Sequence, residues 1–124
     1  AANLAGKVGT VEEYLSKLFS ALGYEVQRTK LTRDGGIDII LKKDSKKTLI
    51  QAKRYAISGT VAVSAVRDVY ANAKKEGAQE LIVLTTAMNF SFDAISQAKE
   101  NGVELWNRDK LKELLKKAKM IKNG

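Results

Sequence analysis

Residues 35–55 read GGIDIILKKDSKKTLIQAKRY, and this stretch decides the centre of the fold. Two runs with the composition of β-strands, Ile37–Lys42 and Thr48–Arg54, flank the polar run 43–46. Strand-like runs separated by a short polar segment are typical of a β-hairpin. The stretch therefore predicts two neighbouring antiparallel strands.

The hairpin also predicts which side chains share a face. A turn centred between Asp44 and Ser45 places Asp38 directly opposite Gln51. Directly opposed residues have Cβ atoms about 4.5–5.5 Å apart, and Lys53 is the diagonal neighbour on the same face. The alternate positions of both strands are apolar, so we expect the other face to be core.

Helix and strand patterns continue on both sides of the hairpin. Apolar stripes and end signals predict helices from Thr10 to Gly23, at about 61–76, after Ser91 and after Asn107, and strands at 24–29, 81–85 and 103–106. The order αβββαβαβα predicts an α/β fold, a mixed central sheet flanked by helices on both sides. A chain of 124 residues has the length of one domain, so we expect one domain over 1–124, with a core at about 9–111 and a basic helix at about 108–121.

Composition excludes several kinds of chemistry. The chain has no cysteine and no histidine, which excludes thiolate and imidazole ligands and a Ser-His-Asp triad. Its apolar runs are far shorter than the roughly 20 residues of a membrane span, and its start lacks the apolar region of a signal peptide. We therefore expect a cytoplasmic protein with no membrane partner.

The net charge of +8 is concentrated in two blocks. Residues 28–54 carry +6 and residues 108–124 carry +5, whereas the rest of the chain is slightly acidic. A localised basic patch is typical of a protein that binds a polyanion such as nucleic acid. A lysine-rich surface that only keeps the protein in solution is the alternative, and charge alone leaves it open.

The polar face of the hairpin suits a hard divalent cation. Mg²⁺ takes oxygen ligands and keeps several waters, so the Asp38 carboxylate, the Gln51 amide oxygen and the Ala52 carbonyl form an adequate set, with Mn²⁺ as a substitute. The Lys53 ammonium could orient an attacking water or offset charge that develops on a phosphate. Stepping 100° per residue along the first helix puts Glu12 at the border of the apolar stripe and Glu13 toward solvent, so we select Glu12 as a further acidic ligand.

At these residues the sequence resembles the Mrr-like branch of the restriction-endonuclease-like, PD-(D/E)xK nuclease superfamily. The matching motifs are GGIDII at 35–40, QAKRY at 51–55, the preceding Val-Glu helix that ends in Leu-Gly-Tyr, and downstream segments at 66–70, 84–86 and 102–105. The resemblance implies an αβββαβ core and Mg²⁺-dependent cleavage of DNA phosphodiesters. It implies that Asp38 and Glu12 bind metal, that Lys53 is the catalytic lysine, and that Gln51 stands where Asp or Glu is more common.

Several alternatives stay open at this level. The chain is expected to be a metal-dependent DNA endonuclease, but a structure-selective nuclease such as a Holliday-junction resolvase and a non-catalytic DNA-binding module share the same fold. The sequence does not decide whether the nucleic acid is DNA or RNA, or which DNA structure is cut. It also does not decide whether the chain is a monomer or a homodimer. The residues expected to contact nucleic acid are Arg33, Arg54, Tyr55, Lys43, Lys46 and Lys47.

Overall fold

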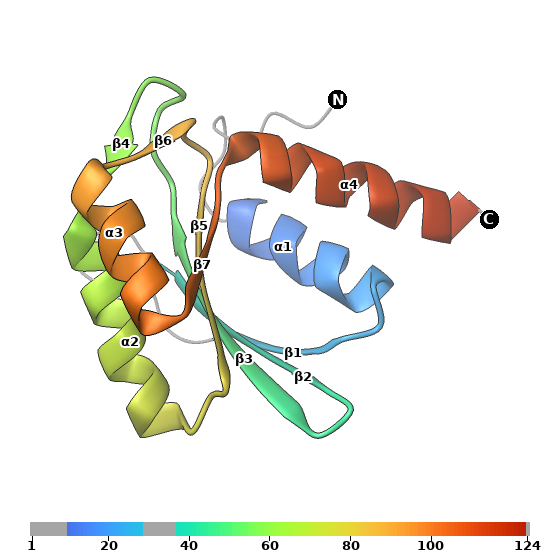
Figure 1. Cartoon of the computed structure of the whole chain (residues 1–124). Helices are drawn as coiled ribbons and strands as arrows, with labels where there is room; N and C mark the ends of the chain where they lie inside the picture. The colour runs from blue at the N-terminus through green and yellow to red at the C-terminus, as the bar shows by residue number, and fades with distance from the viewer. Residues whose placement is uncertain (1–9, 29–36, 124) are drawn as a thin grey trace.

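The computed structural model describes residues 10–28 and 37–123, and within them it leaves out the side chains of residues 10–12, 28, 37–38 and 120–123. The elements are α1 (Thr10–Ala21), β1 (Glu25–Arg28), β2 (Ile37–Lys43), β3 (Lys46–Lys53), β4 (Thr60–Val61), α2 (Val63–Glu76), β5 (Glu80–Thr85), β6 (Asn89–Phe90), α3 (Phe92–Asn101), β7 (Val103–Trp106) and α4 (Arg108–Asn123). The predicted order of helices and longer strands is confirmed (Figure 1).

The main sheet has five strands in the order β1-β2-β3-β5-β7. The first three strands are antiparallel, whereas β3, β5 and β7 run parallel, so the predicted mixed sheet is confirmed. The run Leu81–Leu84 of β5 is apolar throughout because this strand lies between two others, with a helical layer on each face.

The hairpin has the predicted register. Asp38 is the Cα partner of Gln51, and the pairing continues to Lys43 with Lys46. Within the hairpin only Asp44 and Ser45 form the turn, with φ of 52° and 68°. The predicted turn had four residues, but Lys43 and Lys46 belong to the two strands. Two left-handed residues give the turn the twist that matches the flanking strands.

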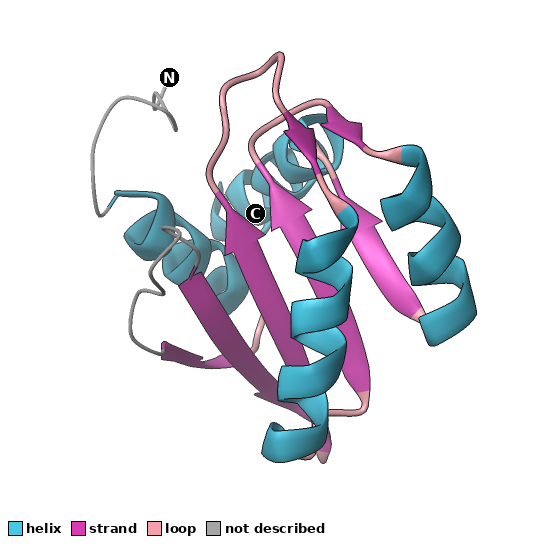
Figure 2. Cartoon of the chain, turned by 90° about the vertical axis from the view of Figure 1, so that its left-hand side faces the viewer, coloured by secondary structure: helices cyan, strands magenta, loops and turns pink. Residues whose placement is uncertain are grey.

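Helices cover both faces of the sheet and bury a separate core on each. The first core packs α1 and α4 against alternate residues of β2 and β3, among them Ile39, Ile50 and Ala52. The second core packs α2 and α3 against the other face, which includes Ile40 and Leu49. Figure 2 shows α2 and α3 in front of the sheet and the remaining helices behind it.

Two short strands were not predicted. Thr60 pairs with Asn89 and Val61 with Phe90 in a separate two-stranded parallel sheet. Val61 is completely buried in the second core, and α2 therefore begins at Val63 and not at residue 61 as predicted. Strands of two residues are too short to show any periodicity, which is why the sequence pattern missed them.

The helix ends follow the sequence signals. Ser91 caps α3 by accepting the N–H of Ala94 at 3.1 Å, and the Asn107 side chain accepts the N–H of Lys110 at 3.1 Å at the start of α4. Gly77 ends α2 with φ of 67°, a conformation that glycine adopts without a steric cost. Among the described helices, none is both long and apolar enough to cross a membrane.

Candidate active site

The backbone brings three predicted site residues to one end of the main sheet. Asp38 is the second residue of β2, Gln51 is its partner on β3, and Lys53 is the last residue of β3. Gln51 and Lys53 are two and four residues after Leu49 on β3, so their side chains point to the same face of the sheet. This is the face that α2 and α3 cover. Ala52 lies between them with its side chain in the first core, on the other face.

Gln51 and Lys53 are more deeply buried than an open polar face would make them. Gln51 is 3% exposed and Lys53 is 5% exposed, since the helices of the second core cover their face of the sheet. The Gln51 Oε1 atom has no hydrogen-bond partner among the described residues. Burying an acceptor without a partner costs roughly 1–3 kcal/mol, so this oxygen is suited to a ligand that the described part of the chain does not supply.

The course of α1 brings Glu12 to the same end of the sheet. The far end of α1 lies at the hairpin tip, where the Lys43 ammonium donates to the Leu22 carbonyl at 3.3 Å. From Leu22 back to Glu12 a helix rises about 15 Å. From Lys43 back to Asp38 a strand runs about 17 Å. The first turn of α1 and the start of β2 are therefore about equally far from the hairpin tip, and α1 covers the opposite face of the sheet (Figure 1).

The segment after β3 carries two of the predicted DNA contacts. Arg54 is exposed, and Tyr55 is 38% exposed. The main chain of Tyr55 is fixed on both sides by Thr86, whose hydroxyl accepts the Tyr55 N–H at 3.0 Å and donates to the Tyr55 carbonyl at 2.7 Å. The sequence analysis did not predict this contact. The one sequence feature that points to it is the pair of hydroxyl residues, Thr85 and Thr86, at the end of the apolar strand β5.

The lysines of the hairpin lie far from these residues. Lys46 is seven residues from Lys53 along β3, which is about 23 Å. Its ammonium lies 3.9 Å from a carboxylate oxygen of Glu80. The Lys47 ammonium donates to the Glu76 carbonyl at 2.6 Å, which ties β3 to the end of α2. The hairpin lysines therefore form a surface separate from the candidate site.

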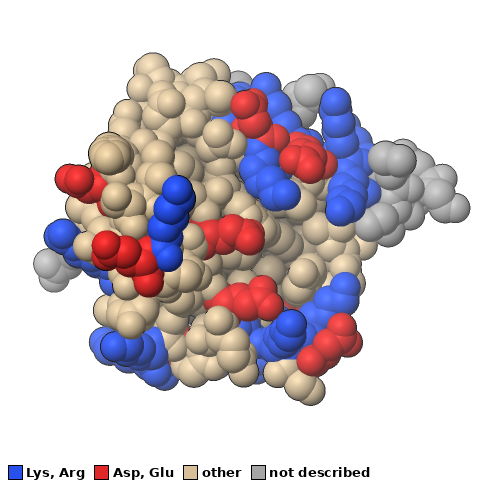
Figure 3. Space-filling view, in the orientation of Figure 1, with Lys and Arg blue, Asp and Glu red and all other residues tan. Residues whose placement is uncertain are grey.

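On the face that Figure 3 shows, positive side chains are mixed with negative ones. Figure 3 shows Lys and Arg side chains gathered over α4 and near the β2–β3 hairpin, with acidic side chains among them. The Lys43 ammonium lies 5.0 Å from the centre of the Tyr24 ring. Arg33, a predicted DNA contact, lies outside the described residues.

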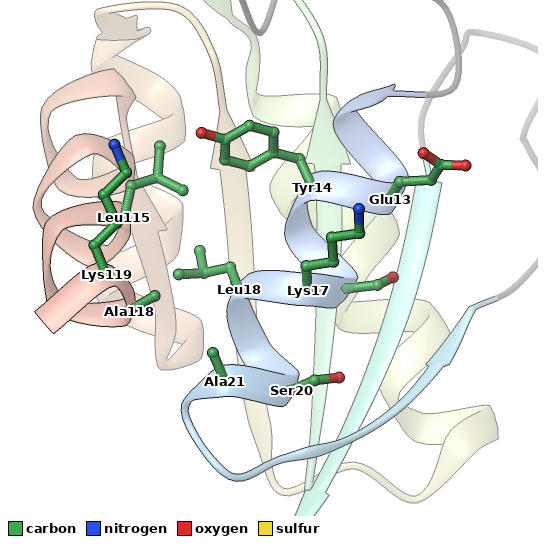
Figure 4. A pocket seen from close by; sticks show the side chains of 10 residues that line it. Glu13, Tyr14, Lys17, Leu18, Ser20, Ala21, Leu115, Ala118 and Lys119 are labelled. Atoms are coloured by element: carbon green, nitrogen blue, oxygen red, sulfur yellow. The ribbon is translucent and has the colours of Figure 1, made fainter. Parts of the chain in front are cut away.

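A groove between α1 and α4 is not part of this site. Its lining includes Glu13, Tyr14, Lys17, Leu18 and Leu115, with Tyr14 directed toward α4 (Figure 4). Because α1 and α4 cover the face opposite to Gln51 and Lys53, the groove is separated from them by the sheet. Glu13 is exposed, in agreement with the predicted phase of the helix.

A metal centre made only of acidic side chains is not present in the described part of the chain. No group of three or more Asp and Glu residues there could hold a metal ion. The side chains of Glu12 and Asp38 are outside that description. The neutral Gln51 oxygen is the side-chain donor of the predicted set that the structure describes, beside the main-chain carbonyl of Ala52. The lack of a hydrogen-bond partner for the Gln51 oxygen among the described residues fits an oxygen-preferring cation.

A family model described as restriction endonuclease, Mrr_cat, matches residues 7–115 of the chain. A comparison with curated proteins gives no match.

Solved nuclease structures share the fold. The DNA modification-dependent restriction endonuclease AspBHI matches with a TM-score of 0.70 and 20% identity, over 93% of this chain and 32% of that one. MspJI restriction endonuclease, solved in complex with a 27-mer oligonucleotide, matches with a TM-score of 0.54 and 17% identity, over 87% of this chain and 27% of that one. A repair endonuclease from Pyrococcus abyssi matches with a TM-score of 0.51 and 15% identity, over 86% of this chain and 49% of that one. The chain thus spans half or less of each of these three proteins.

Proposed function

Since the chain belongs to the Mrr_cat restriction endonuclease family, we propose that it is a metal-dependent DNA endonuclease domain. The observation that carries the proposal is the register of the hairpin, which sets Asp38 opposite Gln51 and puts Lys53 two residues further along the same face. A carboxylate, a neutral oxygen and an ammonium at one end of a sheet are the groups that phosphodiester hydrolysis at a metal ion requires.

Asp38, Gln51, the Ala52 carbonyl and Glu12 would hold Mg²⁺, with Mn²⁺ as a substitute. The unpartnered, buried Gln51 Oε1 supports this set, because a cation offers the missing partner. When bound, the ion would supply Lewis-acid stabilisation of charge on the phosphate and lower the pKa of a bound water. A glutamine in place of a carboxylate removes one negative charge from the site, which favours an anionic substrate.

Lys53 is proposed to act on the scissile phosphate. Its ammonium would offset negative charge that develops on the phosphate oxygens in the transition state. Burial of Lys53 in the second-core face supports this role, because charge interactions are stronger where water is excluded.

DNA is the proposed partner of this site. Arg54 and Tyr55 follow Lys53 directly, are exposed, and would contact the backbone next to the cleaved bond. The two basic blocks would add contacts that do not depend on sequence, Arg33 and the hairpin lysines Lys43, Lys46 and Lys47 among them. The sequence left a homodimer and a monomer open, and light scattering of the purified chain would decide between them.

A cleavage panel tests the proposal. The purified chain would be incubated with Mg²⁺ and plain duplex, methylated duplex, single-stranded DNA and a four-way junction, each with a matching RNA. We expect cutting of at least one DNA that stops on addition of EDTA. Cutting of the junction alone would identify a structure-selective nuclease, whereas DNA binding without cutting of any substrate would identify a non-catalytic module.

Two variants assign the site. Asp38→Ala should abolish Mg²⁺-dependent cleavage while the unfolding transition stays cooperative, since Asp38 lies at the end of a strand. Gln51→Glu should retain cleavage and lower the Mg²⁺ concentration needed for half-maximal rate, because it adds a carboxylate. Full activity of Asp38→Ala would refute the assignment of the metal site.

A further inference from the structure

We propose that Thr86 is a positioning residue of this site, because its side chain and main chain fix the backbone at Lys53 and Tyr55. The inference rests on the proposed role of Lys53. Thr86 itself would contact neither DNA nor metal. It would act by holding the residues that do.

Three hydrogen bonds join Thr86 to the end of β3. The Thr86 N–H donates to the Lys53 carbonyl at 3.3 Å. The Thr86 hydroxyl accepts the Tyr55 N–H at 3.0 Å and donates to the Tyr55 carbonyl at 2.7 Å. Regular pairing of β3 with β5 ends at Lys53 and Thr85, so Thr86 extends the attachment by two residues beyond the sheet.

Thr86 is a firm anchor because it is held in turn by α4. It is 1% exposed, and its carbonyl accepts a hydrogen bond from the Arg108 guanidinium at 3.2 Å. The Arg108 N–H donates to the Ala87 carbonyl at 2.9 Å, and the Asn107 side chain donates to the Met88 carbonyl at 3.3 Å. The start of α4 therefore fixes the segment 86–88, which fixes the segment after β3.

The same two segments meet at a second point. The Met88 N–H donates to the Ile57 carbonyl at 3.0 Å, and the Gly59 N–H closes a turn onto the Ala56 carbonyl at 2.8 Å. Arg54 and Tyr55 are thus exposed side chains on a backbone held at both ends. A loop without these bonds would have to be ordered each time DNA bound.

Loss of the Thr86 hydroxyl should affect cutting more than binding. DNA affinity comes from many phosphate contacts spread over the basic surface, so it depends little on one backbone position. Catalysis requires the ammonium of Lys53 in a fixed position, and a displacement of about 1 Å can cost on the order of a hundredfold in rate. We therefore expect a reduced rate with nearly unchanged affinity.

The test compares Thr86→Val, which keeps the shape and removes the hydroxyl, with Thr86→Ser, which keeps the hydroxyl. Ser91→Ala is the matched control, because it removes another hydroxyl that accepts a main-chain N–H. That hydroxyl caps α3 and lies outside the segments that Thr86 joins. Single-turnover cleavage at saturating protein and DNA affinity are measured for each variant. We expect Thr86→Val to lower the rate about tenfold or more with less than about a threefold change in affinity, and Thr86→Ser and Ser91→Ala to stay near the parent.

Amide hydrogen exchange gives a second readout that does not need activity. In the parent protein the Tyr55 amide should exchange more slowly than the amide of the exposed Ser58, and in Thr86→Val it should lose this protection while the Gly59 amide keeps its own. A fast-exchanging Tyr55 amide in the parent protein would refute the inference even if Thr86→Val does not fold.

Lys53→Ala separates the two proposals. Cleavage at the parent rate by Lys53→Ala would show that the proposed function of Lys53 is wrong. Loss of cleavage in Lys53→Ala together with a parent rate in Thr86→Val would leave the proposed function intact and overturn only the positioning role.

Discussion

Glu12 and Glu13 are neighbours in the sequence, but the helical phase predicts different surroundings for their side chains. Successive residues of a helix point about 100° apart. Glu13 is exposed, as its predicted angle requires. The direction of the Glu12 side chain toward the border of the buried stripe stays a prediction of the same helical phase. The length of α1 places this first turn about as far from the hairpin tip as the start of β2.

We expect Glu12→Gln to reduce cleavage by at least about tenfold while the free energy of unfolding changes by less than about 0.5 kcal/mol. Glu13→Gln should lower the free energy of unfolding and leave cleavage unchanged. It weakens the interaction of the Glu13 carboxylate with the main-chain N–H groups at the helix start, which is of order 0.5–1 kcal/mol. Urea unfolding and Mg²⁺-dependent cleavage of both variants provide the comparison. Activity that depends on Glu13 instead would mean that the assigned helical phase is wrong.

At the level of elements, the β2–β3 hairpin determines the site because its register sets Asp38 against Gln51. A shift by one residue would move every side chain of a strand to the other face. The turn that fixes the register uses Asp44 and Ser45 in the left-handed region, where aspartate is tolerated and serine is strained.

Ser45→Gly should therefore stabilise the protein by about 0.5–1 kcal/mol, since glycine adopts this conformation without a Cβ clash. Urea denaturation measures the change as a higher midpoint at an unchanged slope. Ser45→Ala is the control, as it keeps the Cβ and should give no gain. A stability of Ser45→Gly equal to or below that of the parent would show that the turn is not strained.

For the whole molecule, the distribution of charge separates binding from cutting. The hairpin lysines are about 20–23 Å from Lys53 along the hairpin, and Lys116, Lys117 and Lys119 are eight or more residues into α4, the helix that covers the opposite face. These two groups of lysines are therefore not placed beside a phosphate that is being cut at Lys53. Both can add to the attraction for a long DNA duplex.

Two triple variants measure this contribution. We expect replacement of Lys43, Lys46 and Lys47, or of Lys116, Lys117 and Lys119, by glutamine to weaken DNA binding and flatten its salt dependence by up to about 0.9 in log-log slope per lost phosphate contact. The charge-matched control replaces Lys74, Lys75 and Lys99, which lie outside the two basic blocks. An unchanged slope in both test variants would identify those lysines as ordinary solvated surface.

The sequence by itself determined the parts of this protein that depend on local periodicity. The alternation of the two hairpin strands and the position of the turn were sufficient to pair Asp38 with Gln51. Apolar stripes and end signals located the four helices of the described residues to within a few residues. The motifs around Asp38 and Lys53 also indicated the nuclease family, which the match over residues 7–115 confirms. The roles of Glu12, Asp38, Gln51 and Lys53 stay predictions.

Only the tertiary structure decided what surrounds those residues. Gln51 and Lys53 are buried because α2 and α3 pack on their face of the sheet, and no pattern within β3 states which helices will cover it. The bond between Thr86 and Tyr55 joins residues 31 positions apart, and it exists because β3 and β5 lie side by side. Contacts of this kind depend on how elements pack and not on the period of any one of them, so a single sequence does not contain a local signal for them.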